Sequence, residues 1–387
     1  MKTVNILHVA SFYTMGGIEN ILGDFLKEPQ RGFKFHVFSP YPVLEYWKQQ
    51  FLRHQIPFYQ AMIKNRWGKE IVQVALRCKA DIVHFHWGVS QTGALKKNGV
   101  KAIIAHDHGL AWQYNPTAID FIKKEYQDVD QIISVSDASR LMLNQRFEMN
   151  LDKIVTVYNG INFERLKPIT PVLRPDGKKV VLAIGRLEVQ KGFDSLLKAV
   201  PSINKERKDI KFWIVGDGSL RNNLVDLTVE LGITKYVKFW GAQKDIGNFL
   251  PASEILILPS IWEPFGNVLV EAGYFKKPCI ATNIDGIPEI IIHGETGILI
   301  DPALTVTPDK HHPWMVLNGR TKTIQPPLSV APDSLEEAIL QLLHKPRLRK
   351  SMGEKAHQRV VRLFNYHSYR DKLMGIYRGL MDGFNLA

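Results

Sequence analysis

Two glutamates, Glu263 and Glu271, are separated by seven residues in the stretch EPFGNVLVE. A proline and a glycine open this stretch, and a helical pattern begins near Asn267. The first-turn N–H groups of such a helix, at Gly266, Asn267 and Val268, have no partner inside the helix, and with the helix dipole they favour a phosphate. A ligand with hydroxyls beside a diphosphate, such as a sugar nucleotide, would fit, with Glu263 accepting from the sugar and Glu271 from the ribose. Two surface carboxylates at a helix start are the simpler alternative.

A second pair of candidate residues follows the apolar run VVLAI, which ends at Gly185. Arg186 stands at the expected carboxyl end of this strand, where open α/β sheets bind their ligands. Lys191 follows across a short loop. Because Arg grips phosphate oxygens in a bidentate way and Lys adds a compact charge, the pair favours an anionic ligand over two solvated side chains.

Two glycines, Gly16 and Gly17, follow the first apolar run of the chain. Glycine lets the backbone approach a ligand closely, but a tight turn explains such a pair equally well.

Four histidines lie at two expected strand ends, His84 with His86 and His106 with His108. Residues i and i+2 of a strand share a face, so each pair could present both rings together, and imidazole is a ligand for zinc and copper. Ordinary strand-end histidines, of which one at most touches a substrate, explain the pattern better. The D-x-D triplet at 128–130 is better explained as a solvated turn. The sequence therefore predicts no metal site.

Short β-branched runs alternate with amphipathic stretches along the chain. Repeated β-α units of this kind favour an α/β fold with parallel, doubly wound sheets. The expected strands are 4–9, 34–38, 82–86, 102–105, 131–135, 154–157, 180–184, 211–215, 237–239, 255–258, 278–282 and 297–300. About six of them precede residue 160 and six follow residue 178, which predicts two Rossmann-like halves. The polar segment 162–179, with three prolines and a glycine, is the expected boundary.

The segment 302–332 holds six prolines and no clear periodicity. A loop of this length in a compact domain is usually functional or disordered. His311, His312 and Trp314 could make it a flap or a partner surface, and a disordered insert is an equal alternative.

Composition sets the broad class. The chain has 387 residues, of which 45% are apolar and 23% charged, as in ordinary globular proteins of two or three domains. No apolar run reaches the roughly 18–20 residues that span a bilayer, and the N-terminus lacks a signal-peptide cleavage site. Cys78 and Cys279 offer neither a disulfide framework nor metal spacing. We therefore expect a cytoplasmic protein.

The formal charge of +12 is concentrated in two segments. Residues 51–100 hold 8 basic and 2 acidic groups (+6), and residues 344–387 hold 10 and 3 (+7). Such an excess favours an anionic partner, but no nucleic-acid-binding signature is present. Residues 61–79 mix Lys and Arg with apolar side chains, which predicts either an amphipathic helix on an anionic membrane surface or a packed helix with a solvated basic face.

Taken in order, these residues resemble the retaining glycosyltransferases of family 4, which have the GT-B architecture. The resemblance spans about residues 4–301. It is carried by the glycine loop from Gly16 to Glu19, by His108 with Gly109, by the segment 159–168, by the run from Gly185 to Gly192, by Glu263 and Glu271, and by the segment 286–297.

The resemblance implies two Rossmann-like domains that face a central cleft. Residues 1–165 would bind the acceptor, residues 178–360 would bind a nucleoside diphosphate sugar, and residues 361–387 would form a helix that packs back toward the first domain. It also implies transfer with retention, no metal, no cofactor, a UDP-sugar as donor, and a glycan or lipid-linked acceptor in cell-surface polysaccharide synthesis. Such an enzyme would be cytoplasmic, held peripherally on the inner face of the membrane.

The resemblance further implies a role for each site residue. Arg186 and Lys191 would neutralise the leaving diphosphate, Glu263 would contact the transferred sugar, and His108 would hydrogen-bond it. His106 competes with His108 for that role, and the glycine that follows His108 favours the latter. The donor would be lined by Gly16, Gly17, Gly185, Trp240, Phe265, Gly266, Asn267, Val268 and Glu271. A sugar nucleotide epimerase of the same fold and a non-enzymatic anion-binding protein are the alternatives.

Overall fold

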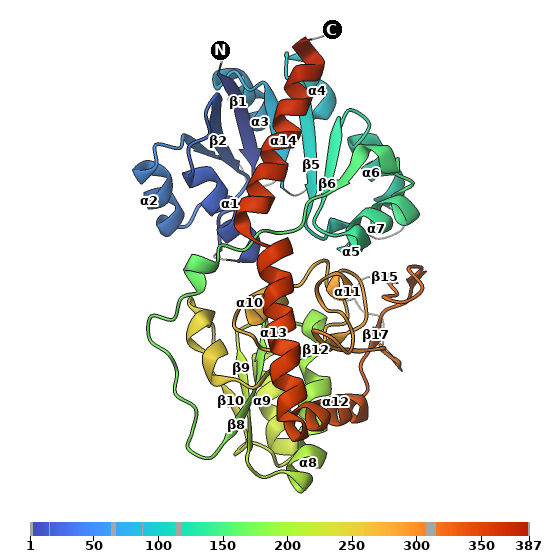
Figure 1. Cartoon of the computed structure of the whole chain (residues 1–387). Coiled ribbons are helices and arrows are strands. Elements are labelled where there is room, and N and C mark those ends of the chain that lie inside the picture. The colour runs from blue at the N-terminus through green and yellow to red at the C-terminus, as the bar shows by residue number, and fades with distance from the viewer. Residues whose placement is uncertain are drawn as a thin grey trace. The chain divides into compact units, whose positions relative to one another are not determined.

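The computed structural model describes residues 3–14, 16–62, 67–86, 88–113, 118–306 and 315–385. The chain forms two compact units, one of residues 1–160 with 366–387 and one of residues 161–365 (Figure 1). The sequence placed the boundary in 162–179, but here the second unit begins at Ile161. The connecting segment belongs to that unit because Ile169, Thr170 and Val172 donate backbone hydrogen bonds of 2.8–3.0 Å to Asn248.

A seven-stranded parallel sheet, in the order β3-β2-β1-β4-β5-β6-β7, forms the first unit. Its strands are β1 (Val4–Val9), β2 (Phe33–Ser39), β3 (Phe58–Gln60), β4 (Ile82–Phe85), β5 (Ala102–Asp107), β6 (Gln131–Ser134) and β7 (Ile154–Thr156). Its helices are α1 (Gly17–Lys27), α2 (Glu45–Arg53), α3 (Trp67–Arg77), α4 (Thr92–Lys97), α5 (Leu110–Gln113), α6 (Ile119–Glu125), α7 (Asp137–Phe147) and α14 (Tyr366–Asn385). Every residue of β4 and β5 is buried, as expected for parallel strands covered on both faces.

Helix α14 completes the first unit although it is made of the last residues of the chain. Tyr369, Leu373 and Tyr377 are buried along one side of it. The hydroxyl of Tyr366 donates to Glu28 Oε2 at 2.7 Å, and Arg370 pairs with the same carboxylate at 2.6 Å. The helix therefore lies against α1 and the sheet of this unit.

The second unit contains a six-stranded parallel sheet in the order β10-β9-β8-β11-β12-β13. Its strands are β8 (Lys179–Ile184), β9 (Ile210–Val215), β10 (Val237–Phe239), β11 (Ile255–Leu258), β12 (Cys279–Thr282) and β13 (Gly297–Ile300). Its helices are α8 (Phe193–Glu206), α9 (Arg221–Glu230), α10 (Asn267–Tyr274), α11 (Ile287–Ile290), α12 (Pro332–His344) and α13 (Pro346–Leu363). The core lies between β8 and its neighbours and the apolar sides of α8 and α12. Two Rossmann-like α/β units confirm the predicted fold class.

The proline-rich segment forms two short antiparallel ladders in the second unit. Strand β14 (Leu304–Thr305) pairs with β17 (Leu328–Ser329), and β15 (Val316–Leu317) pairs with β16 (Ile324–Gln325). His311, His312 and Trp314 lie outside the described residues. The ladders were not predicted, because two-residue strands leave no period in the sequence.

No helix in the described part of the chain is long and apolar enough to cross a bilayer.

Candidate functional site

The loop after β11 holds Glu263 in place through both its backbone and its side chain. Glu263 is buried, and its Oε2 accepts from Lys191 Nζ and, at 3.3 Å, from Ser260 Oγ. Its backbone N–H donates to Asp285 Oδ2 at 2.9 Å. The carboxylate is therefore fixed at the carboxyl end of the sheet, where ligands of such folds bind.

The structure brings Lys191 and Glu263 together from positions 72 residues apart. Both side chains are largely buried, with 13% and 10% exposure. Arg186 is exposed and donates to Gln190 Oε1 at 3.1 Å, and the amide of Gln190 donates to the carbonyl of Trp262 at 3.1 Å. Gln190 thus ties the predicted diphosphate residues to the Glu263 loop, and these groups leave one net positive charge for an anion.

Gly185 and Gly216 let the ends of β8 and β9 approach each other. A Cβ atom on Gly216, which has a φ of 140°, would lie 1.9 Å from the carbonyl oxygen of Gly185. Any side chain there would force the two strand ends apart. The Gly216 N–H donates to Gly241 O at 2.9 Å, which brings the loop after β10 to the same edge.

Trp240 follows β10 and presents a partly exposed indole at this edge. Its ring packs edge-on against Trp213, with centroids 5.1 Å apart. The ammonium of Lys238 lies 3.5 Å from the Trp240 ring centroid, a cation–π contact. A flat ring held in this way could stack on a base, so the assignment of Trp240 to the donor base stays a prediction.

Helix α10 starts directly after the Glu263 loop, as the sequence predicted. Its N-cap is Gly266, in the left-handed region with a φ of 104°, and Asn267 and Val268 are half-buried in its first turn. Phe265 is different, because its ring is buried against Phe364 with centroids 5.5 Å apart. The ring of Phe265 is therefore not presented to a ligand.

Glu271 lies in the second turn of α10 and is half-buried. Burial raises its pKa to about 7, and the positive charge of Arg165 opposes that rise. Glu271 therefore changes its protonation state near physiological pH. The residue could donate or accept a hydrogen bond, depending on its protonation.

His108, Gly16 and Gly17 lie in the first unit, and the other predicted site residues lie in the second. His108 follows β5 and is half-buried, whereas His106 is 1% exposed within the strand. Burial lowers the pKa of His108 to about 3 and that of His106 well below its usual value, so both rings are neutral. Of the two, His108 is the more accessible to a ligand.

The glycine loop of the first unit surrounds a buried carboxylate. Gly17 begins α1, and Gly16 is its N-cap in an extended conformation. A Cβ on Gly16 would lie 2.6 Å from Glu19 Oε2, and Glu19 also accepts from Thr14 Oγ1. Gly16 therefore lies against the end of the Glu19 side chain, and the roles of Gly16 and Gly17 in donor binding stay predictions.

Sequence reasoning missed several residues that hold the site. Asp285 is fully buried, and its Oδ1 accepts from Leu317 N–H at 2.7 Å while its Oδ2 accepts from Glu263 N–H. Asp107 accepts from Gly109 N–H at 3.3 Å and from the Ser139 hydroxyl, which shapes the turn after β5. Asp107 ends the buried strand β5, and Asp285 follows the buried strand β12. An acidic residue at the end of an apolar run was the sequence signal that could have identified them.

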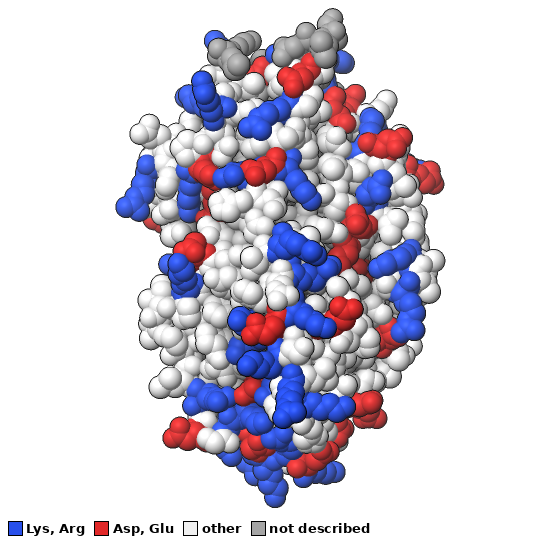
Figure 2. Space-filling model, in the orientation of Figure 1, with Lys and Arg blue, Asp and Glu red and all other residues white. Residues whose placement is uncertain are grey.

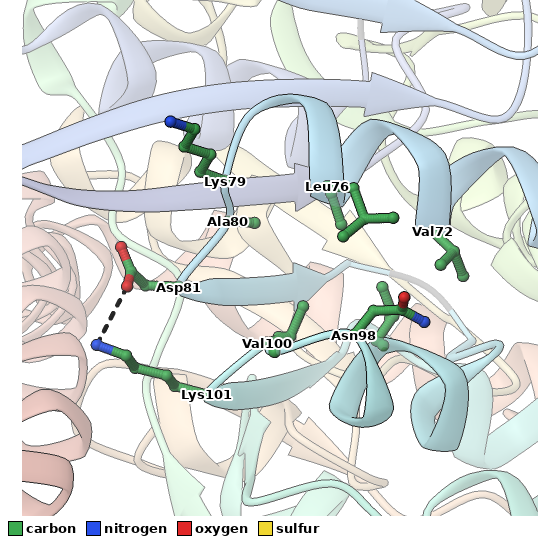
Figure 3. Close-up of a pocket in the computed structure, with 11 residues that line it drawn as sticks. Val72, Leu76, Lys79, Ala80, Asp81, Asn98, Val100 and Lys101 are labelled. Atoms are coloured by element: carbon green, nitrogen blue, oxygen red, sulfur yellow. Dashed lines mark ion pairs between the residues drawn. The ribbon is translucent and has the colours of Figure 1, made fainter.

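Two other features lie away from these residues. Asp130 accepts from Ile103 N–H at 2.7 Å and pairs with Lys96, so it supports the fold. A pocket of about 320 Å³ lies at the amino ends of β4 and β5, where Asp81 pairs with Lys101 at 3.3 Å (Figure 3). None of the predicted site residues lines this pocket.

Two family models match the chain, one on each side of residue 166. Residues 15–165 match the model described as Glycosyltransferase Family 4, and residues 167–307 match Glycosyl transferases group 1.

Curated relatives agree with these matches. An uncharacterized glycosyltransferase of Methanocaldococcus jannaschii is 27% identical over 92% of this chain and 92% of its own length. A second one from that organism is 32% identical over 44% of this chain, but the match spans about half (47%) of that relative. The lipopolysaccharide core biosynthesis glycosyltransferase LpsD of Rhizobium meliloti is 37% identical over 36% of this chain and 41% of its own length.

Solved structures show the same fold. A glycosyltransferase from Rickettsia africae superposes with a TM-score of 0.79 and 20% identity, covering 98% of this chain and 99% of that one. HepE of Anabaena, solved with UDP-glucose, gives a TM-score of 0.76 and 19% identity, covering 97% and 99%. The chain therefore has the GT-B architecture.

Proposed function

The chain belongs to the glycosyltransferases of group 1 and family 4, and from this premise we propose that it moves a sugar from a UDP-sugar to a glycan or lipid-linked acceptor. The observation that carries the proposal is the ion pair between Lys191 and Glu263. Arg186 is linked to the same loop through Gln190, which it contacts by a hydrogen bond. A cation and a carboxylate fixed side by side suit a ligand in which a diphosphate is joined to a sugar. The complex of HepE with UDP-glucose supports this class of donor.

In the proposed reaction the bond between the anomeric carbon and the diphosphate oxygen breaks. Arg186 and Lys191 stabilise the negative charge that develops on the leaving diphosphate. Glu263 contacts the sugar and stabilises the positive charge on its ring, and His108 hydrogen-bonds it. The acceptor hydroxyl attacks from the same face, and its proton passes to the leaving phosphate oxygen, so the anomeric configuration is retained.

Because Arg186 and Lys191 would meet the diphosphate in this proposal, we propose that transfer requires no divalent metal ion at that position. A covalent adduct between the sugar and a carboxylate would contradict the single-step route, and mass spectrometry of the enzyme trapped with a slow donor analogue would detect it.

The acceptor is proposed from the relatives and from the charge of the chain. One relative is named for lipopolysaccharide core biosynthesis, which supports cell-surface polysaccharide synthesis here. A lipid-linked acceptor would be met at a membrane surface, and the basic segments would hold the enzyme there, on the cytoplasmic face. The names of the relatives favour transfer over the epimerase alternative.

The test measures donor binding and hydrolysis with a panel of nucleotide sugars. We expect the wild type to bind and slowly hydrolyse one UDP-sugar, and Glu263→Ala and Lys191→Ala to lose about 100-fold or more in turnover, as when one stabilising group is removed from an active site. Lys198→Ala is the matched control, because it breaks an exposed ion pair with Asp194 in the same unit. If no sugar nucleotide binds to the wild type, the proposed function fails.

A further inference from the structure

Five imidazoles share one face of the sheet in the first unit. His8 of β1 is in register with His84 of β4, and the next same-face position of β4 is His86, directly beyond the paired end of that strand. His106 of β5 and His108 after it continue the row. Neighbouring rings stack, with centroids 4.1 Å apart for His84 and His86 and for His106 and His108. The site proposed above uses one of these five rings.

We propose that His86, His106 and His108 bind one divalent transition-metal ion of the zinc class. One ring nitrogen from each of the three lies within 4.8 Å of the others. His86 Nδ1 and His108 Nε2 are 3.3 Å apart. Two nitrogens that each lie about 2.0–2.1 Å from a tetrahedral ion are about 3.3–3.4 Å apart, so this pair has the spacing of two ligands on one metal.

His8 supplies the outer contact that a metal-binding histidine needs. When a histidine binds a metal through one nitrogen, it usually donates the other N–H to a neighbouring acceptor. His86 would bind through Nδ1, and its Nε2 lies 3.0 Å from His8 Nδ1. His84 is not among the proposed ligands, because its Nδ1 lies 2.7 Å from the Tyr377 hydroxyl and is already hydrogen-bonded.

His106 gives an independent reason for a ligand. Both of its ring nitrogens are buried, and within the described part of the chain neither has a hydrogen-bond partner. A buried polar group without a partner destabilises the fold. A metal ion would engage one of these nitrogens.

The ligand chemistry defines the class of metal. Three imidazoles without a thiolate or carboxylate in the group favour zinc, copper or cobalt over magnesium or calcium. Three protein ligands leave a fourth position for water or another ligand. His108 is only half-buried, so access would be from its side of the strand end. The proposal rests on the first unit alone, and its test does not require sugar transfer. With the ion bound, His108 Nε2 is a metal ligand and is not available to hydrogen-bond the sugar.

The test titrates the full-length, chelator-treated protein with cobalt(II), whose visible spectrum distinguishes tetrahedral from octahedral coordination. We expect one equivalent to bind with intense tetrahedral bands and to be displaced by zinc. His106→Gln should weaken cobalt binding at least tenfold, and His8→Gln should weaken it about 10–100-fold, the usual effect of losing an outer-shell partner.

His36→Gln is the matched control. His36 is a buried imidazole of β2 that lies on the opposite face, since its register partner is Leu7 and not His8. It should leave cobalt binding unchanged, as should Glu263→Ala. Absence of stoichiometric binding in the wild type, an octahedral spectrum, or unchanged binding in His106→Gln would overturn the proposal. If His106→Gln does not fold, as judged by circular dichroism, the wild-type spectrum and stoichiometry still decide.

Discussion

The contact between Lys191 and Glu263 makes each residue depend on the other for stability as well as for chemistry. Removing one partner of a buried ion pair leaves the other charge desolvated, which costs about 3–5 kcal/mol when burial is complete. Here both side chains keep some exposure, so we expect Lys191→Met or Glu263→Gln alone to lower the free energy of unfolding by about 2–4 kcal/mol.

The double variant should recover most of that loss, because no unpaired charge remains. Urea unfolding of both single variants and the double variant measures the coupling. Lys198→Ala, which breaks an exposed pair, should change stability by less than about 1 kcal/mol. Additive effects of the two site variants would show that the pair is not coupled.

Glu271 gives the stability of the protein a dependence on pH. Its pKa is raised from 4.5 to about 7 by burial, so the folded state holds this proton more tightly than the unfolded state. The penalty is absent below about pH 4.5, grows through the window up to pH 7 and is complete above it. We expect Glu271→Gln to raise the free energy of unfolding by about 1–3 kcal/mol at pH 8 and by little at pH 4.5. Urea unfolding at both values measures this, with exposed Glu230→Gln as the control.

Donor affinity should follow the same carboxyl group. If Glu271 accepts from ribose hydroxyls, its ionised form binds best, so the dissociation constant for the UDP-sugar should fall as pH rises through 7. Glu271→Gln should bind more weakly at pH 8 and lose this dependence. A donor titration that is flat from pH 6 to 8 in the wild type would contradict the role. The sequence located Glu271 but not its pKa, because burial depends on the packing of α10 against the segment around Arg165.

At the scale of elements, most strands were predicted because each is an uninterrupted apolar run followed by a turn. Strand β3 was missed because Pro57 precedes it and only two of its three residues are aromatic or apolar, so it does not stand out as an apolar run. The ladders of 304–329 were missed because two-residue strands show no period, and with them the role of Asp285, whose partner Leu317 lies in β15. Sequence motifs therefore located the residues expected to touch the ligand, but not the side chains that hold them.

Asp285 connects the Glu263 loop to β15. One of its carboxylate oxygens accepts from the backbone N–H of Glu263, and the other accepts from the backbone N–H of Leu317. In Asp285→Asn an NH₂ group replaces one oxygen, so one buried N–H loses its acceptor. We expect the free energy of unfolding to fall by about 1–3 kcal/mol and turnover to fall more than donor affinity. Asp301→Asn, an exposed change beside the same ladders, should have a small effect. Equal effects of the two variants in urea unfolding and kinetics would remove the positioning role.

At the scale of the whole molecule, much of the positive charge of the basic segment 344–387 lies on α13. Figure 2 shows Lys and Arg side chains gathered along this helix. Arg349 pairs with Glu254, and Arg359 donates to the backbone carbonyls of residues 289 and 290. Arg347, Lys350, Lys355 and Arg362 are exposed. Some basic side chains of α13 therefore bond within the second unit, and the others face solvent.

Vesicle flotation tests whether this basic surface binds a membrane. We expect binding to vesicles that contain anionic lipid, weakening as salt rises, because each cation near such a surface contributes about 1 kcal/mol. Lys350→Glu with Lys355→Glu should reduce binding at least tenfold, whereas Lys205→Glu with Lys208→Glu, at exposed positions at the end of α8, should reduce it less. No binding of the wild type at moderate salt, or equal losses in the two variants, would remove the idea.

The first unit is discontinuous in sequence, since α14 returns to it after the whole second unit has been made. During synthesis, residues 1–160 leave the ribosome before α14, whose side chains Tyr369, Leu373 and Tyr377 are buried in the first unit. The second unit is continuous in sequence, so all of its residues have been synthesised before the last residues of the first unit. We therefore expect a fragment that ends at residue 365 to lose cooperative unfolding in the first unit, measured by hydrogen exchange, while the second unit keeps its protection. We therefore expect the unit that the ribosome begins first to be the last to complete its fold.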